Sequence, residues 1–178
     1  RARKGHLTYA SAGTGGPAHL AGALLAHTTG TSMTHVPFKG MGPGIVEIIA
    51  GRVDYTFYTM SGLKEYVATK RLRPLAITAA RRHPDFPDVP TMTELGFPGF
   101  DDVGAWFGIV APAGTPAAAV SRLNAVVDAS LSKPQVREKL VGMGMVPVGG
   151  PPSAFRSFLE QDSQRWTALI RAAGIRGE

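Results

Sequence analysis

The residues best suited to chemistry lie in one short loop near the start of the chain. The loop consists of small and hydroxyl-bearing residues: Ser11, Ala12, Gly13, Thr14, Gly15 and Gly16. Glycines allow the backbone to approach a ligand closely, and the following Pro17 favours the first position of a helix. The N–H groups at a helix start have no intrahelical acceptor and carry partial positive charge. With the hydroxyls of Ser11 and Thr14, they would bind a carboxylate or a phosphate.

Two enzyme patterns fit this loop only in part. Residues 13–18 match the G-x-G-x-x-G/A pattern of dinucleotide-binding loops, but no acidic residue precedes Glu47 to hold a ribose. A triad of Ser11, His19 and Asp54 would lack the G-x-S-x-G nucleophile elbow. The chain is therefore not expected to be an enzyme. The alternative is an α/β enzyme that binds a phosphorylated substrate or nucleotide at the Ser11–Gly16 loop.

Further candidate ligand-binding residues follow from the position of this loop. His19 lies in the first turn of the next helix and is expected to hold the loop or contact a ligand. A second glycine-containing loop carries Lys39 and Gly40, and the lysine would neutralise a ligand carboxylate. Tyr58 and Thr59 end a predicted strand on the side where ligands collect.

Composition excludes several kinds of site. The chain has 178 residues, no cysteine and a net charge of +6. Without cysteine there are no disulfides, thiol nucleophiles or cysteine zinc sites. The five histidines show no metal-ligand spacing, so neither a metal nor another cofactor is expected. The basic residues form no stripe with interleaved aromatics, so nucleic acid is not an expected partner.

Apolar segments and helix signals alternate along the chain and predict an α/β fold. Strands are expected at residues 7–10, 33–36, 55–58, 74–78 and 106–111. Helices are expected at residues 17–30, 43–50, 61–69, 115–131, 134–142 and 153–173. Ser61 would cap the third helix, and Thr91 with Glu94 would form a capping box that opens a short one. Trp106, Phe107 and the apolar stripe of the last helix are expected in the core.

Six stretches, taken in order, carry a family resemblance. They are Leu7–Gly15 with His19–Gly22, His35–Gly40, Gly51–Asp54, Arg73–Thr78, Asp88–Thr91, and Trp106–Gly108 through Ala111–Pro116. From Leu7 to Ile175, nearly the whole chain resembles the Bug-type solute-binding proteins, the TctC-like receptors of tripartite tricarboxylate transporters.

The resemblance implies a type II periplasmic-binding-protein-like fold, with a sheet flanked by helices and two lobes that close on a small carboxylate. Residues 1–104 would form the ligand-binding α/β lobe, and residues 105–178 the mostly helical, incomplete part of the other lobe. The implied function is an extracytoplasmic receptor that captures a di- or tricarboxylate or an acidic amino acid for membrane transporter subunits. Its implied location is the periplasm, and we expect the export signal to lie outside the given residues, because no apolar stretch follows the basic start at residues 1–5.

Two departures from the family pattern modify these expectations. Family members usually carry a long N-terminal segment with its own glycine-rich ligand loop, and the given residues, which could be a fragment or a shortened gene product, do not include it. An incomplete lobe would leave apolar surface uncovered on the last helices, which favours a homodimer or an exchange of elements between chains. Tyr58 stands where an acidic residue is common in the family, which would shift preference away from ligands with an amino group.

Overall fold

The computed structural model describes residues 6–101 and 103–175, and these divide into two compact units. Unit 1 comprises the described residues of Arg1–Ala105 and of Trp166–Glu178, and unit 2 comprises Trp106–Arg165. The last helix, α6 (Pro152–Ala172), therefore contributes residues to both units. No helix among the described residues is long and apolar enough to cross a membrane.

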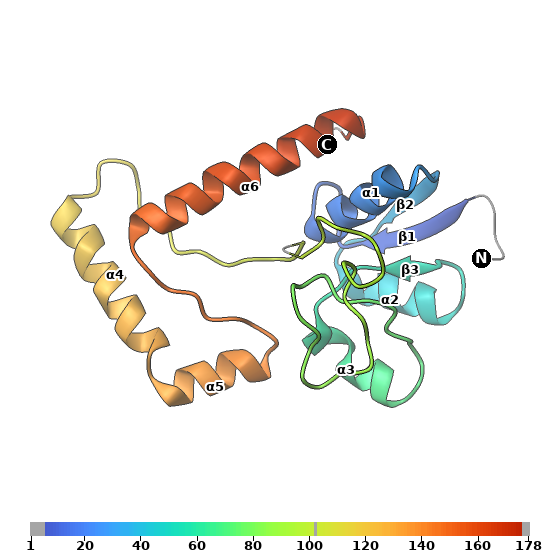
Figure 1. Ribbon diagram of the computed structural model, residues 1–178, viewed down its shortest axis with the longest axis horizontal. Coiled ribbons are helices and arrows are strands. Elements are labelled where there is room, and N and C mark those ends of the chain that lie inside the picture. The colour runs from blue at the N-terminus through green and yellow to red at the C-terminus, as the bar shows by residue number, and fades with distance from the viewer. Residues whose placement is uncertain (1–5, 102, 176–178) are drawn as a thin grey trace. The chain divides into compact units, whose positions relative to one another are not determined.

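Unit 1 is built on a three-stranded parallel sheet (Figure 1). The strands lie in the order β2-β1-β3 and are β1 (Leu7–Ser11), β2 (Met33–Pro37) and β3 (Tyr55–Thr56). Tyr9 in the central strand lies beside His35 on one side and Tyr55 on the other. The strands run in the same direction because a helix returns the chain across the sheet after each of the first two.

The helices of unit 1 follow the strands as predicted. They are α1 (Pro17–Thr29), α2 (Met41–Ile49) and α3 (Met60–Ala68). The predicted proline start and glycine end of α1 are confirmed, and α2 begins two residues before the prediction. The predicted cap at Ser61 is wrong, because Thr59 precedes the first turn of α3 and Ser61 lies inside that turn.

Alternating residues of β1 pack on opposite faces of the sheet. Toward α2, the fully buried Ala10 forms an apolar cluster with Met41, Ile45 and Val53. On the α1 face, the hydroxyl of Tyr9 lies 3.5 Å from the carbonyl oxygen of His19. A second apolar cluster includes one residue of α1 and three later ones: Ala21, Met92, Phe100 and Val103. The sheet is thus covered by helices on both faces (Figure 1).

Asp54 fastens β3 to β1 at the amino ends of the strands. Its carboxylate accepts hydrogen bonds from the backbone N–H of Thr8 at 2.8 Å and from the Thr8 hydroxyl at 2.9 Å. The backbone N–H of Asp54 in turn donates to the Thr8 hydroxyl oxygen at 3.1 Å. These bonds place Asp54 at the edge of the sheet opposite the glycine loops, so the triad of Ser11, His19 and Asp54 does not form.

Two predicted strands and one predicted helix are wrong. Residues 74–78 form only a single bridge, Ile77 to Thr91. Pro74, at the start of this segment, has no N–H to donate to a ladder. Residues 106–111 pair with no strand in the described chain. The capping box of Thr91 and Glu94 forms, with bonds of 2.7 and 3.1 Å, but only a turn follows it. Pro98 follows too closely for a helix to continue.

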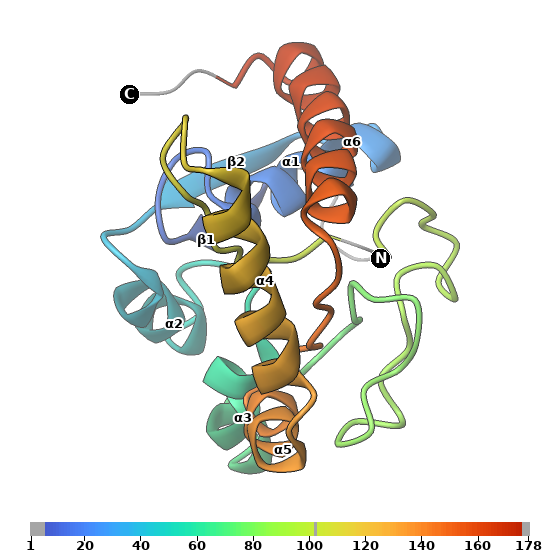
Figure 2. The ribbon, with the colours of Figure 1, turned by 90° about the vertical axis from the view of Figure 1, so that its left-hand side faces the viewer.

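Unit 2 contains α4 (Ala117–Leu131), α5 (Pro134–Gly142) and most of α6, with α5 directly following α4 (Figure 2). The Trp106 ring packs edge-on against Phe155 and Phe158 of α6. Trp106 is nevertheless 47% exposed and Phe107 is 83% exposed. The core prediction for them is therefore wrong. A side chain is buried only when neighbours surround it, and none of the described residues of unit 2 is buried.

The close approach of α1 to the sheet depends on Gly22. A Cβ at this position would lie 2.2 Å from Cε2 of Tyr9, far inside van der Waals contact. Gly22→Ala is expected to lower the free energy of unfolding by about 1–3 kcal/mol, because the helix and the ring would have to separate. Urea unfolding followed by circular dichroism measures this loss.

Gly42→Ala is the matched control for this substitution. Gly42 also lies in a helix, but its added Cβ would meet nothing within 4 Å. The control is expected to be neutral or more stable by up to about 1 kcal/mol, because alanine favours helix more than glycine does. Equal stability of the two variants would contradict the packing of Gly22 on Tyr9.

Candidate functional site

The carboxyl ends of the three strands bring three loops to one edge of the sheet. Residues 12–16 connect β1 to α1, residues 38–40 connect β2 to α2, and residues 57–59 connect β3 to α3. In a parallel sheet such connections share one edge, which is where ligands bind in open α/β folds. We call these three loops, with the strand ends and first helical turns that border them, the loop edge. All the predicted ligand-binding residues lie within it.

Each helix at the loop edge begins without a side-chain cap. The residues before the first turns of α1, α2 and α3 are Gly16, Gly40 and Thr59, and none makes a capping side-chain hydrogen bond. None of the three first turns contains an acidic residue. The partial positive charge of the helix starts is therefore not neutralised locally. An anion at such a start is typically stabilised by about 0.3–1 kcal/mol.

Gly15 gives the first loop its turn. Its φ of 76° lies in the left-handed region that side-chain-bearing residues rarely adopt. This conformation directs its backbone N–H to Nδ1 of His19, at 3.0 Å. A second bond closes the loop on itself, from the N–H of Gly16 to the carbonyl of Gly13 at 3.4 Å.

Ser11 holds the base of the loop from inside the protein. Its side chain is fully buried. Its Oγ lies 2.6 Å from Nε2 of His35, 2.9 Å from the carbonyl oxygen of Gly13 and 3.2 Å from the Gly13 nitrogen. All three contacts are satisfied when the hydroxyl donates to the Gly13 carbonyl and accepts from Gly13 N–H and His35 Nε2–H. The Ser11 proton is then directed at the loop backbone and not at a ligand.

His19 and His35 stack face to face between the two ends of the loop. Their ring centroids are 3.7 Å apart and their planes differ by 6°. His19 is buried, and its Nδ1 accepts the Gly15 N–H, so the proton of the neutral ring lies on Nε2. His35 contacts Ser11 at the start of the loop, as described above. The stacked pair therefore connects Ser11 to Gly15 through side chains.

Tyr9 extends this stack across the sheet. Its ring centroid lies 5.2 Å from that of His35 and 5.7 Å from that of Tyr55. The register of the strands places these three rings side by side on one face. The histidine pair is thus continuous with a row of rings beneath α1.

Burial keeps this row uncharged at neutral pH. Desolvation first, and repulsion from His19 second, lower the pKa of His35 to about 4. Desolvation also lowers the pKa of His19. Burial raises the pKa of Tyr9 to about 12, and the pKa of Tyr55 is raised by the same cause.

The remaining predicted residues lie nearer the surface of the loop edge. Ala12, Lys39, Gly40 and Thr59 are exposed, and Thr14 is half-buried. Lys39 is thus positioned in the second loop as the sequence implies.

Tyr58 is 43% exposed and packs against the first turn of α3. A Cβ on Gly62 would lie 2.3 Å from Cε1 of the Tyr58 ring, so the ring lies directly on this glycine. A phenol therefore covers the start of α3.

His35 is a loop-holding residue that the sequence patterns do not reveal. In sequence it stands 24 positions from Ser11. Only the pairing of β1 with β2, which sets Tyr9 opposite His35, brings the two side chains together. The available signal was the position of His35 near the end of a predicted strand that leads into the second loop.

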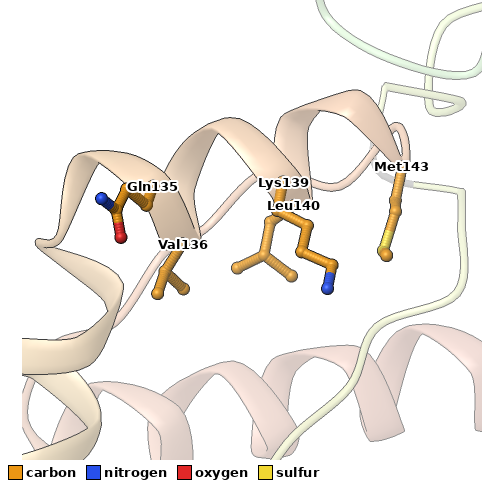
Figure 3. A pocket seen from close by; sticks show the side chains of 5 residues that line it. All are labelled: Gln135, Val136, Lys139, Leu140 and Met143. Atoms are coloured by element: carbon orange, nitrogen blue, oxygen red, sulfur yellow. The ribbon is translucent and has the colours of Figure 1, made fainter.

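Two surface hollows involve none of the loop-edge residues. One lies on α6 and is lined by Leu159, Glu160, Ser163 and Gln164. The other lies on α5, where Val136, Leu140 and Met143 point to the same side of the helix (Figure 3). The first is lined mainly by polar side chains and the second mainly by apolar ones. Within the described residues, no group of three or more His, Asp or Glu side chains could hold a metal ion.

The chain matches a known family of receptors over nearly all of its length. Residues 1–175 match the family model of the tripartite tricarboxylate transporter family receptor, TctC. The chain belongs to this family. This assignment confirms the resemblance predicted from the sequence, and the similar solved structures confirm the α/β, periplasmic-binding-protein-like fold class.

Individual proteins resemble the chain over nearly all of its length. The UPF0065 protein of the tcbD–tcbE intergenic region of a Pseudomonas species is 39% identical over 171 residues, covering 96% of this chain and 51% of that protein. A structure of an R. palustris protein with adipate is 35% identical, with a TM-score of 0.84. The match covers 97% of this chain and 57% of that one. MatC from Rhodopseudomonas palustris with bound malate is 34% identical, with a TM-score of 0.78. The match covers 92% of this chain and 56% of that one. The chain thus spans about half the length of the Pseudomonas relative.

The histidine pair predicts how stability depends on pH. Both pKa values are lower in the folded chain than the ordinary 6.5, so the unfolded chain binds more protons in acid. The stabilisation is complete above about pH 6.5 and is lost as the pH falls toward 4. Because His35 is only half-buried, we expect a loss on the order of 1 kcal/mol. Urea unfolding at pH 7.5, 6.5, 5.5 and 4.5 measures it.

His35→Gln separates this effect from the titration of carboxylates. Glutamine keeps a hydrogen-bond donor for Ser11 but does not titrate. As the pH falls from 6.5 to 4.5, the free energy of unfolding of His35→Gln should therefore decrease less than that of the unsubstituted chain. Parallel profiles for the two proteins would show that His35 does not titrate as described.

Proposed function

We propose that the loop edge binds one carboxylate of a small dicarboxylate in a solute-binding receptor. The carboxylate would accept hydrogen bonds from N–H groups at the starts of α1, α2 and α3. Lys39 would add a full positive charge. The ligand is captured and released without a chemical step.

The observation that carries this proposal is the convergence of three uncapped helix starts at one edge of the sheet. The first turns of α1, α2 and α3 contain no acidic side chain. The first acidic residue of the chain, Glu47, lies in the last turn of α2 and pairs with Arg52. Asp54 is held by Thr8 at the opposite edge. An anion at the loop edge would thus be stabilised by the partial positive charge of three helix starts.

The relatives support a carboxylate over a phosphate. The two similar R. palustris structures contain adipate and malate, which share two carboxylates on a short carbon chain. Against the alternative of an enzyme with a phosphorylated substrate or nucleotide stand the contacts of the loop itself. The Ser11 hydroxyl and the His19 ring, the groups such chemistry would use, are engaged with the loop backbone.

Tyr58 supports ligands that lack an amino group. Its ring covers the start of α3, where it offers a hydroxyl and no carboxylate. An ammonium group at the loop edge would face helix starts of the same sign without a counter-charge from this position. We therefore propose that malate is preferred over aspartate, which differs from it in carrying an ammonium in place of a hydroxyl.

We further propose that the receptor works in the periplasm and delivers its ligand to the membrane subunits of a tripartite tricarboxylate transporter. Membership of the TctC family supports both steps.

Isothermal titration calorimetry with malate, adipate, aspartate and a nucleoside monophosphate tests the ligand assignment. Malate or adipate should bind at least about tenfold more tightly than aspartate, because an unpaired like charge is costly. Lys39→Gln should weaken dicarboxylate binding roughly two- to fivefold, as expected for an exposed ion pair.

Lys70→Gln is the matched control for Lys39→Gln. Lys70 follows the carboxyl end of α3, about 13 Å along the helix from its start. Its loss of charge should leave the affinity for malate unchanged. Binding of the nucleotide without binding of either dicarboxylate would favour the enzyme alternative, and no heat with any carboxylate would reject the proposal for this chain.

We also propose that the exposed apolar side chains of unit 2 mediate self-association into a homodimer. Several large ones are more than 70% exposed: Phe107, Ile109, Val110, Val146 and Val148. Such surface favours a partner over water.

Sedimentation velocity over a range of concentrations measures the proposed self-association. The double substitution Phe107→Asp with Val148→Asp should weaken self-association roughly tenfold or more, because each charge replaces an apolar side chain that the proposed dimer interface would bury. Ser121→Asp adds a charge at an exposed polar position of the same unit and should have little effect. A monomer at all concentrations for the unsubstituted chain would reject this proposal.

A further inference from the structure

The support beneath the first loop contains two groups that change their hydrogen bonding on protonation. We propose that His19 and His35 are positioning residues, which as a neutral stacked pair hold the Ser11–Gly16 loop in its carboxylate-receiving conformation, and that their protonation releases both loop and ligand. This inference rests on the proposed function for its ligand and on the geometry of the pair for its mechanism.

The sensitive contact is the one between His19 and Gly15. The Nδ1 atom of His19 accepts the Gly15 N–H at 3.0 Å. A proton on Nδ1 would turn this acceptor into a donor, and two N–H groups would then point at each other. The ring or the Gly15 peptide must rotate to relieve this. Gly15 can rotate at little cost because it has no Cβ.

The contact of His35 with Ser11 responds differently. Its Nε2 already carries a proton when it donates to the Ser11 hydroxyl, so protonation at Nδ1 leaves this hydrogen bond intact. The effect of a proton on His35 is electrostatic. With centroids 3.7 Å apart, two imidazolium rings would repel each other strongly in a partly buried site.

The groups that face the pair do not favour positive charge. From β1 they are Tyr9 and Ser11, and Tyr55 of β3 adjoins Tyr9 in the same row. All are uncharged at neutral and mildly acidic pH. The pKa values of both histidines are accordingly lowered, mainly by desolvation. Ligand binding should therefore be complete above about pH 6.5 and decrease as the pH falls toward 4.

Amide hydrogen exchange of the full chain tests the loop without a ligand. At pH 7.5, His19→Leu should raise the exchange rate of the Gly15 N–H roughly tenfold, because leucine cannot accept its hydrogen bond. His19→Asn should restore most of the protection, because its amide oxygen can lie near the former Nδ1. His27→Asn is the control on the same helix, since His27 is exposed in the last turn, and it should change nothing.

Malate titrations at pH 7.5 and pH 4.5 test the release. Titration of malate itself affects every variant equally, so the comparison isolates His19. The affinity of the unsubstituted chain should fall by roughly twofold or more beyond that of His19→Asn over this interval. Thermal unfolding at both pH values checks that each variant remains folded during the titration.

The outcomes separate this inference from the proposed function. An equal pH dependence of malate affinity in the unsubstituted chain and in His19→Asn would overturn the proposed release of the loop and ligand. Unchanged Gly15 exchange in a folded His19→Leu variant would overturn the positioning role, even if malate binds. Failure of malate and adipate to bind at pH 7.5, with Gly15 exchange behaving as expected, would reject the proposed ligand and support the loop-holding role.

Discussion

The packing of Tyr9 is the constraint on which unit 1 depends. Its ring lies between His35 and Tyr55 across the sheet and directly against Gly22 of α1. Helix, sheet and loop therefore cannot move independently. A shift of α1 carries His19 with it, and His19 holds the Gly15 peptide. Because protein interiors are packed as densely as crystals, even a small change at this ring reaches the loop. Core and candidate site are one connected structure here.

The parallel topology separates structural from chemical tasks. At the amino edge of the sheet, the carboxylate of Asp54 accepts two hydrogen bonds from Thr8. At the carboxyl edge, three helices begin without caps and without acidic neighbours. The unit thus offers an anion a set of fixed backbone dipoles, and it uses the side chains of Ser11 and His19 to orient the loop that carries some of them. The proposed recognition by backbone groups would tolerate different ligand skeletons as long as a carboxylate is present.

Local signals in the sequence predicted much of this arrangement. Pro17 and Gly30 marked the two ends of α1, and the glycines at positions 13–16 marked the loop. Contacts between residues distant in the sequence could not be predicted from these local signals. The bond from His35 to Ser11 depends on the register of β1 against β2, and the residues at 74–78 and 106–111 look like strands but lack a ladder partner. Likewise, Trp106 and Phe107 have core-type side chains, and only the surroundings in unit 2 decide that they are exposed.

The span of α1 from one edge of the sheet to the other has a practical consequence. The helix of 13 residues begins at the glycine loop and ends at the turn 30–32, on the side where Asp54 and Thr8 close the sheet. That turn contains exposed residues and takes no part in the loop edge. A fluorescent protein inserted there would be connected to the loop by a rigid rod about 20 Å long. A change in the loop conformation would then be transmitted to the fluorophore, so the helix could serve as the lever arm of a biosensor.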